Sequence, residues 1–416
     1  MEAARAKEPK LEEVRVSAAW TLPRTASFWL LAVLLGLLLF AASAPSPLYP
    51  VYAAIWHFSP VTVTAIYAVY AFWALAALLL TGRVSDHVGR RRVLMLALVV
   101  QIAGMLGFVA AEGVAGLFAA RSVQGLATGM ATSAISAWLL DLQPPDNPRL
   151  GSLVGGIALV AGLAAGAVGS GLLVHYGPDP LHFVYWLLTA VFAVALVAML
   201  VIPDPVERTP GWRRSMRPLI GVPPAARPLF AASAPTLIAT WAVGGLYLSL
   251  GPSLAASLLQ SDSRVAGGLV IAALFGASAV ASVLVLGHDP RAIVIAGSLV
   301  LIVGVAITLS SVAVGSAAWL YAGSVVAGLG LGPAFSGVFQ SLGPLAPPDQ
   351  RGALLASMYI VVYLAFSVPA IIAGVAATLY GLRETTYGYG FVVIALAATT
   401  TIAVLRRPSH ATPAPE

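Results

Sequence analysis

Long apolar stretches without any charged residue alternate with short polar segments along the whole chain. A helix needs about 20 mostly apolar residues to cross the roughly 30 Å hydrocarbon core of a bilayer. Each charge-free interval of that length therefore predicts a membrane-spanning helix, six in the first half of the chain and six in the second. The spans lie at 25–82 (two spans), 93–111, 113–140, 150–174, 183–202, 229–260, 265–286, 292–342 (two spans), 352–380 and 388–405.

The grouping of the spans predicts two halves joined by a polar, proline-rich segment. We expect an all-α integral membrane protein with twelve transmembrane helices as two pseudo-symmetric six-helix bundles. Its parts are a cytoplasmic tail at 1–24, an N-terminal bundle at 25–202, a cytoplasmic linker at 203–228, a C-terminal bundle at 229–405 and a cytoplasmic tail at 406–416.

Basic residues are distributed unevenly between the two sides of this arrangement. With both termini in the cytoplasm, 19 of the 22 Lys and Arg residues fall in cytoplasmic segments, while Arg264 and Arg383 lie outside and Arg121 lies inside a span. Cytoplasmic loops of membrane proteins carry the excess of Lys and Arg. The distribution predicts that both termini and the linker are cytoplasmic.

The start of the chain allows one alternative interpretation. Arg24, the apolar run 28–41 and Ala42-Ser43-Ala44 resemble a signal peptide with its cleavage site. Its polar leader is long for such a peptide, and cleavage would remove a span and disturb the charge distribution. We therefore expect an uncleaved first span.

Composition agrees with a membrane protein and excludes several classes of function. Hydrophobic residues make up 59% of the 416 residues and charged residues only 9%, with a mean hydropathy of +0.93, whereas soluble domains are about 25% charged. A soluble enzyme and a nucleic-acid binder are excluded, in spite of the net charge of +6. The chain has no cysteine, six histidines and few acids, so we expect no disulfide, metal site or cofactor. The only lysines, Lys7 and Lys10, lie in no nucleotide-binding motif.

The loop between the second and third spans reads Gly82-Arg-Val-Ser-Asp86-His-Val-Gly89-Arg90-Arg91-Arg92. Glycines permit a tight turn, and arginines can hold a carboxylate ionised. The alternative is a basic cytoplasmic turn that only satisfies the charge rule. Asp141, at the cytoplasmic end of the fourth span, is the expected partner of Arg90 or Arg91.

The fourth span places a permanent charge within the membrane. At 100° per residue, Arg121, Gln124, Gly125 and Thr128 form one polar stripe, and a buried arginine must face protein or a wet cavity. We expect this stripe to line a central cavity; the alternative is that Arg121 only bonds backbone carbonyls of a neighbouring helix. No Asp or Glu lies within a span, so such a cavity favours a neutral or anionic substrate with acceptor groups over a lipophilic cation.

Two further sets of residues in the spans are candidate functional residues. Gly162, Gly166 and Gly171 follow one another in the fifth span, although small residues also serve close helix packing. Aromatic residues of the spans are candidate substrate contacts, with packing or a place at the lipid interface as the alternative for each. They are Tyr67, Tyr70, Trp138, Trp241, Tyr247, Tyr359 and Tyr363.

Together these motifs resemble the major facilitator superfamily. The loop matches its G-x-x-x-D-x-x-G-R-[RK] signature, with His87 at a position that is usually basic, and the fourth span resembles its R-x-x-Q-G-x-x-x-G element. The fifth span resembles the G-x-x-x-G-P-x-x-G-G element of its proton-coupled antiporters, with Ala167 and Ser170 as departures. The resemblance implies two facing six-helix bundles and a substrate near the membrane midplane. It also implies a cytoplasmic gate formed by the loop motif Gly82, Asp86, Gly89, Arg90 and Arg91 and braced by contacts of its arginines with Asp141.

The resemblance also implies the function. We expect a secondary active transporter that moves a small organic molecule by alternating access, most simply as a proton-coupled efflux permease. The alternative is a proton-coupled importer or a facilitator of a small metabolite or organic anion; a membrane receptor or enzyme lacks the large outer segments or clustered acids and histidines it would need. We expect a monomer in the inner or plasma membrane of a prokaryote, with its substrate, protons and the lipid bilayer as partners and no nucleic acid.

Overall fold

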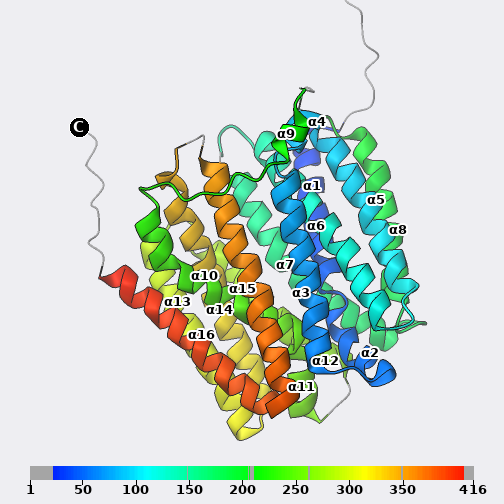
Figure 1. Ribbon diagram of the computed structural model, residues 1–416, viewed down its shortest axis with the longest axis vertical. Helices are drawn as coiled ribbons and strands as arrows, with labels where there is room; N and C mark the ends of the chain where they lie inside the picture. Colours follow the sequence, from blue (N-terminus) through cyan, green and yellow to red (C-terminus); the bar gives the residue numbers. More distant parts are fainter. Residues whose placement is uncertain are drawn as a thin grey trace, which may run out of the picture.

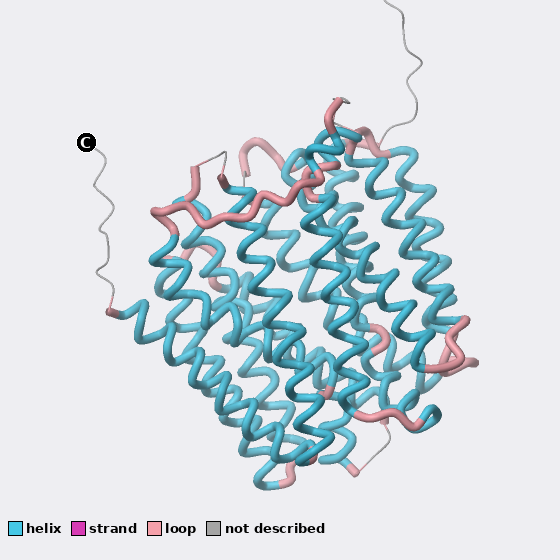
Figure 2. Tube along the Cα trace, in the orientation of Figure 1, coloured by secondary structure: helices cyan, strands magenta, loops and turns pink. Residues whose placement is uncertain are grey.

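The computed structural model describes residues 22–147, 149–204, 206, 210–260, 263–347 and 350–406. Within these ranges the chain forms helices joined by loops, without a strand (Figures 1 and 2). The two predicted tails lie almost wholly outside the described residues. The helices are α1 (Arg24–Ser43), η1 (Ser46–Leu48), α2 (Tyr49–Trp56), α3 (Pro60–Thr81), α4 (Ser85–Val88), α5 (Arg90–Val109), α6 (Val114–Leu142), α7 (Leu150–Tyr176), α8 (Phe183–Ala198), η2 (Met199–Val201), α9 (Trp212–Ser215), α10 (Arg227–Ser249), α11 (Gly251–Leu259), α12 (Arg264–Leu284), α13 (Pro290–Val314), α14 (Ala317–Leu342), η3 (Gly343–Leu345), α15 (Arg351–Tyr380) and α16 (Leu382–Leu405).

The described helices confirm the all-α fold and the twelve predicted spans. Eleven segments are long and apolar enough to cross a membrane, the first of them running from Arg24 to Trp56. The twelfth is α6, which has 29 residues and carries Arg121 and Gln124. The largest difference at a boundary is in the last span, where α16 begins at Leu382 rather than at the predicted residue 388. Its exposed first turn accommodates Glu384, a charge that a helix N-terminus favours.

The first span is broken in the middle by prolines. α1 ends at Ser43 and α2 begins at Tyr49, with Pro45 and Pro47 between them. Proline has no backbone N–H and interrupts the hydrogen-bond ladder of a helix. The seventh span has a comparable break at Leu250, where α10 gives way to α11.

The two halves of the chain pack together along two helix pairs, α3 with α15 and α7 with α12 (Figure 1). Small residues allow this close approach. A Cβ on Gly268 of α12 would overlap the carbonyl oxygen of Ala167 on α7, and one on Gly374 of α15 would overlap the side chain of Thr64 on α3. These contacts lie toward the ends of the helices that the charge distribution places outside, and we call them the outer seam.

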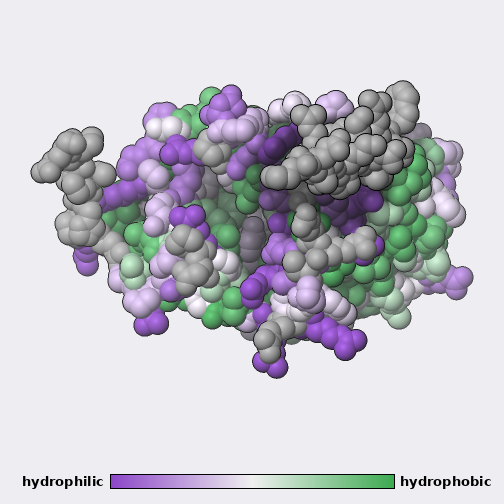
Figure 3. Space-filling model, turned by 90° about the horizontal axis from the view of Figure 1, so that it is seen from above, coloured by the Kyte–Doolittle hydropathy of each residue, from purple (hydrophilic) through white to green (hydrophobic). Residues whose placement is uncertain are grey.

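The surface is divided as a bilayer requires. Large apolar side chains such as Phe72, Val194 and Phe391 are more than 60% exposed on the flanks. Figure 3 looks onto the end of the molecule that carries α4 and α9. Hydrophilic side chains cover much of the described part of this face. This is the end that the basic residues predict to be cytoplasmic.

Candidate functional site

Arg121 lies fully buried in the N-terminal half. Its Nε donates to the Tyr49 hydroxyl at 2.7 Å, and its Nη1 donates to the carbonyl oxygen of Ala42 at 2.9 Å and to Oε1 of Gln124 at 2.6 Å. Four aromatic rings surround the guanidinium with centroids 4.7–5.8 Å from Cζ: Tyr49, Tyr67, Tyr70 and Phe108. Hydrogen bonds and cation–π attraction together stabilise the buried charge.

The polar groups around Arg121 replace backbone bonds that are missing at the break in the first span. In an unbroken helix the carbonyl of Ala41 would accept from residue 45, but Pro45 has no N–H. Nε2 of Gln124 donates to that carbonyl instead, at 2.8 Å, and Ser170 of α7 donates to the carbonyl of Ala44 at 2.5 Å. Side chains of α6 and α7 thus cap the carbonyls that the break leaves open.

The rest of the predicted polar stripe is also buried. Thr128 donates to the Gln124 carbonyl at 2.9 Å, and a Cβ on Gly125 would overlap the backbone of Tyr70 on α3. Of the three hydrogen bonds that Arg121 donates, one goes to a backbone carbonyl of the neighbouring α1 and two go to side chains. Its place in a substrate cavity stays a prediction.

A row of aromatic rings runs from this charge into the C-terminal half. Tyr67 meets Phe366 of α15 at 6.4 Å between ring centroids, and Phe366 meets Trp241 of α10 at 6.2 Å. We call the connected rings the aromatic row: Tyr49, Tyr67, Phe366, Trp241, Phe335, Phe339 and Tyr359. The Tyr67–Phe366 contact is its crossing point between the halves.

Phe366 belongs to the row although the sequence analysis did not select it. It follows Tyr359 and Tyr363 at a spacing of seven and three residues, which puts all three on one face of a helix. That periodicity is the signal that could have identified it. Tyr363 on α15 and Tyr70 on α3 lie on the two helices that pack against each other between the halves.

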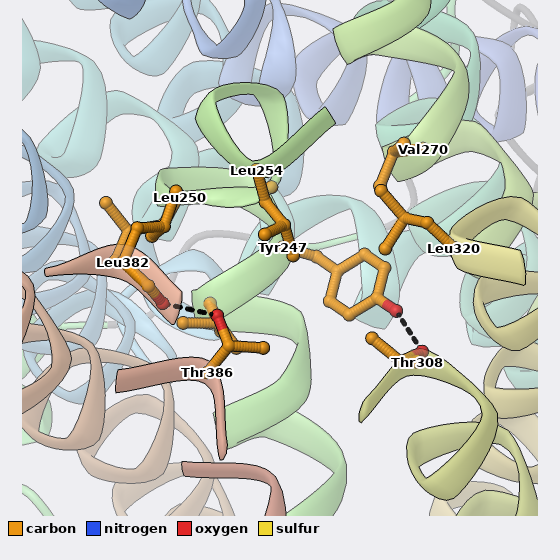
Figure 4. A pocket seen from close by; sticks show the side chains of 10 residues that line it. Tyr247, Leu250, Leu254, Val270, Thr308, Leu320, Leu382 and Thr386 are labelled. Atoms are coloured by element: carbon orange, nitrogen blue, oxygen red, sulfur yellow. Dashed lines mark hydrogen bonds between the residues drawn. The ribbon is translucent and has the colours of Figure 1, made fainter. Parts of the chain in front are cut away.

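Two other candidate contacts lie apart from the aromatic row among the described residues. Trp138 is fully buried near the opposite end of α6 from Arg121. The Tyr247 hydroxyl points at Thr308, 3.1 Å away, and accepts from Ser324 at 3.2 Å (Figure 4). Beside Tyr247 is a cavity of about 20 Å³, which has room for a water molecule and not for an organic substrate.

The two halves place different chemistry at equivalent positions. Gly125 of α6 packs against the backbone of α3, and Gly328 of α14 packs in the same way against α12. Four residues before each glycine stand Arg121 and Ser324, respectively. The N-terminal half therefore holds a buried cation where the C-terminal half holds a hydroxyl group that bonds Tyr247.

The glycines of the fifth span serve two interfaces. A Cβ on Gly162 or Gly166 would overlap the backbone of α1, and one on Gly171 would lie 2.9 Å from the carbonyl oxygen of Arg264 on α12. The first two glycines therefore hold α7 against the broken span, and the third belongs to the outer seam. A role in coupling stays a prediction.

The loop between α3 and α5 is built around Arg90, whose side chain is 9% exposed. Its Nη1 pairs with Asp86 and donates to Ser85 Oγ at 2.7 Å, and its Nε donates to Asp141 Oδ2 at 3.1 Å. The guanidinium of Arg91 instead donates to the carbonyl of Leu200 at 3.3 Å. We call Asp86, Arg90 and Asp141 the gate cluster; its function stays a prediction.

Two residues near the gate cluster were missed by the sequence analysis. Arg24 donates to the carbonyls of Asp141 and Leu142 at 2.5 and 3.2 Å, a favourable place for a cation at the C-terminus of a helix. Asp204 accepts hydrogen bonds at the start of α5. Neither role can be recognised from a local motif, because Arg24 and Asp204 each contact residues more than 100 positions away in the sequence.

The packing between the halves is closed toward the outer end. In the inner part of α7, 150–159, only Gly151 is buried, whereas eight residues are buried between 160 and 174. A Cβ on Gly156 would meet no atom within 4 Å. α7 is thus closely packed in its outer part and loosely packed in its inner part.

Gly268→Val is expected to open the outer seam and to reduce transport at least about tenfold, because the new side chain overlaps the backbone of Ala167. Gly276→Val is the matched control on the same helix, since a Cβ there would lie 3.9 Å from Ala164. Labelling from outside of a cysteine placed at Val168 measures the opening. Equal labelling and equal transport in the two variants would contradict a tight outer seam.

Comparison with known proteins agrees with this architecture. Residues 29–368 match the family described as Major Facilitator Superfamily. The fold is similar to a bacterial homologue of the human lysosomal transporter Spinster in an inward-facing and occupied conformation, with 13% identity, a TM-score of 0.76 and coverage of 93% of this chain and 99% of that one. It is also similar to a POT family transporter in complex with 5-aminolevulinic acid, with 14% identity, a TM-score of 0.72 and coverage of 90% of this chain and 95% of that one.

No curated protein matches the chain. Because the family match spans most of the chain, from the first span to α15, the chain belongs to the major facilitator superfamily and is a membrane transporter rather than an enzyme.

Proposed function

We propose that this transporter exports a small organic molecule with acceptor groups, neutral or anionic, in exchange for protons. The observation that carries the proposal is the aromatic row, which links the buried Arg121 to the C-terminal half across the contact between α3 and α15. Substrate sites of such transporters lie near the midplane between the two halves. Rings from both halves supply the apolar walls that an organic molecule needs.

Two buried donors on opposite sides of the crossing point support a substrate with acceptors. Among the described residues, Nη2 of Arg121 and Nε1 of Trp241 have no hydrogen-bond partner although both atoms are buried. Leaving a buried donor unpaired costs about 1–3 kcal/mol. A carbonyl or carboxylate that reached either atom in another state of the cycle would recover that free energy, whereas a cation would be repelled by Arg121.

The direction and the coupling ion are proposed from the packing and from the positions of the acids. An exporter takes up its substrate in the conformation that is closed toward the outside. The close packing of the outer seam supports such a conformation. No described Asp or Glu lies in the middle of a span, so a coupled proton would be carried at helix ends, by Asp86, Asp141 or Glu112, or by a histidine. The importer or facilitator remains the alternative, because it would pass through the same conformation when releasing substrate.

The chain is a multi-pass membrane protein, and we propose the cell membrane of a prokaryote as its location, with both termini cytoplasmic and a monomer as the working unit. The charge distribution supports the orientation. A monomer is supported by the superfamily architecture, in which one chain supplies both halves of the pathway.

Efflux from proteoliposomes tests the proposal. We expect aromatic carboxylates and their neutral esters to compete at concentrations at least about tenfold lower than matched quaternary ammonium compounds. A pH gradient at clamped membrane potential should accelerate efflux. Competition by cations alone would contradict the proposed substrate class, and flux that does not respond to the gradient would contradict proton exchange.

A pair of tryptophan variants locates the site within this assay. Trp241→Phe removes one buried N–H and keeps a ring in the aromatic row, so binding of an acceptor should weaken about tenfold, or ~1.4 kcal/mol. Trp186→Phe changes a ring that is 53% exposed on the lipid-facing side of α8 and serves as the control. Equal behaviour of the two variants would place the substrate elsewhere.

A further inference from the structure

The first backbone donors of α5 are satisfied by a carboxylate from a distant part of the chain. Asp204 follows η2, at the beginning of the segment that joins the two halves. Its Oδ1 accepts from the backbone N–H of Arg90 and its Oδ2 accepts from that of Arg91, each at 3.2 Å. The first N–H groups of a helix have no partner within the helix, and a carboxylate there is favoured by the helix dipole.

The glycine of the loop motif is explained by this carboxylate. Gly89 has φ +105°, in the region that favours glycine. A Cβ at this position would also lie 2.6 Å from Oδ2 of Asp204. Any other residue would therefore meet both backbone strain and the carboxylate, so Gly89 and Asp204 form one structural unit.

The C-terminal half solves the same problem locally. There α13, the counterpart of α5, begins after Asp289, whose own carboxylate accepts from the backbone N–H of Ala292 at 2.9 Å. In the N-terminal half the position before the helix is Gly89, which cannot cap. The cap of α5 is thus supplied from the start of the linker instead of from the loop. It joins two segments that are 114 residues apart in the sequence.

We propose that Asp204 is a positioning residue of the gate cluster. Its carboxylate fixes the first turn of α5 and thereby the place from which the Arg90 side chain reaches Asp86 and Asp141. The same Oδ1 accepts from the backbone N–H of Val206 at 3.3 Å, so the linker is held to the cluster as well. A displacement of the linker when the halves move is in this way transmitted to Arg90.

The cap itself is tested without any transport assay. In the full-length protein in detergent or nanodiscs, Asp204→Ala should increase hydrogen exchange of the amides of Arg90 and Arg91 at least about tenfold. Asp146→Ala, which removes an exposed carboxylate from the loop between α6 and α7, should leave that exchange unchanged. Unchanged protection in Asp204→Ala would overturn the proposal, and this arm does not depend on the proposed substrate or direction.

The link to the gate is tested by accessibility in this naturally cysteine-free chain. A cysteine at Gly156, in the loosely packed inner part of α7, reports on the cytoplasmic opening. Asp204→Ala should change its labelling rate at least threefold and lower the maximal transport rate with little change in KM, while Asp204→Glu, which keeps a carboxylate, should recover part of both. Lost amide protection with unchanged labelling would overturn the link between Asp204 and the gate cluster.

Discussion

Arg121→Ala is expected to stop transport and to destabilise the N-terminal half. The substitution removes the donor from the carbonyl of Ala42, from Tyr49 and from Oε1 of Gln124, all of them buried. Each buried group left without its partner costs about 1–3 kcal/mol, so we expect a loss of about 3 kcal/mol or more in the free energy of unfolding. Thermal unfolding of the purified protein, together with transport in proteoliposomes, measures both effects.

A second variant separates bracing of the first span from recognition of the substrate. Gln124→Ala removes the cap on the carbonyl of Ala41 and keeps the charge of Arg121, so it should lower stability while the preference for anions over cations persists. Arg121→Lys keeps the charge with a single ammonium in place of the planar guanidinium and should also retain that preference. An Arg121→Ala protein that still transported and still preferred anions would restrict Arg121 to a structural role.

Asp86→Asn is expected to reduce transport at least about tenfold while the protein still inserts into the membrane. Asp86 is one of two carboxylates on the nearly buried side chain of Arg90, and its loss leaves Asp141 as the remaining partner. Insertion should be normal because the loop lies at the end of the spans. Transport normalised to the amount of protein in the membrane is the measurement, with Asp146→Asn as the control; near-normal transport by Asp86→Asn would remove this loop from the mechanism.

A double-mutant cycle tests whether the gate cluster acts as a unit. Arg90→Ala and Asp141→Ala remove the two ends of one ion pair with a 3.1 Å separation between Nε and Oδ2. Residues in direct contact typically show interaction energies of about 0.5–3 kcal/mol, so the double variant should be less impaired than the two single effects predict. Strictly additive losses would show that the pair in the structure does not contribute to transport.

The sequence was sufficient to predict the spans, because the bilayer imposes a length and an apolar composition that can be read locally. The contact between Asp141 and a loop arginine was also foreseeable, since both lie at the same ends of neighbouring spans. What could not be predicted is the partner set of Arg121. Its bonds to α1 and to Tyr49 span 72–79 residues and depend on how closely two helices pack, which hydropathy does not encode.

Asp204 shows a different limit of sequence reasoning. A capping residue normally precedes its helix directly, as Asp289 does for α13, and that local pattern is recognisable. The cap of α5 instead comes from beyond α8, so only the fold brings it to the helix. Phe366 is an intermediate case: its helical spacing from Tyr359 and Tyr363 marked the face of α15, but its neighbour Tyr67 lies in the other half of the chain.

Because of the capped break, the first span consists of two helical segments, α1 and α2, joined by a bend. After Ala44 donates to Phe40, the backbone ladder resumes only where Leu48 and Tyr49 donate to the carbonyl of Pro45, so a bend between Ala44 and Pro45 breaks no helical hydrogen bond. The angle is held by the hydrogen bonds that Gln124, Arg121 and Ser170 donate to the buried carbonyls of Ala41, Ala42 and Ala44. A shift of α6 or α7 would therefore act on the first span directly at its bend, through these three donors.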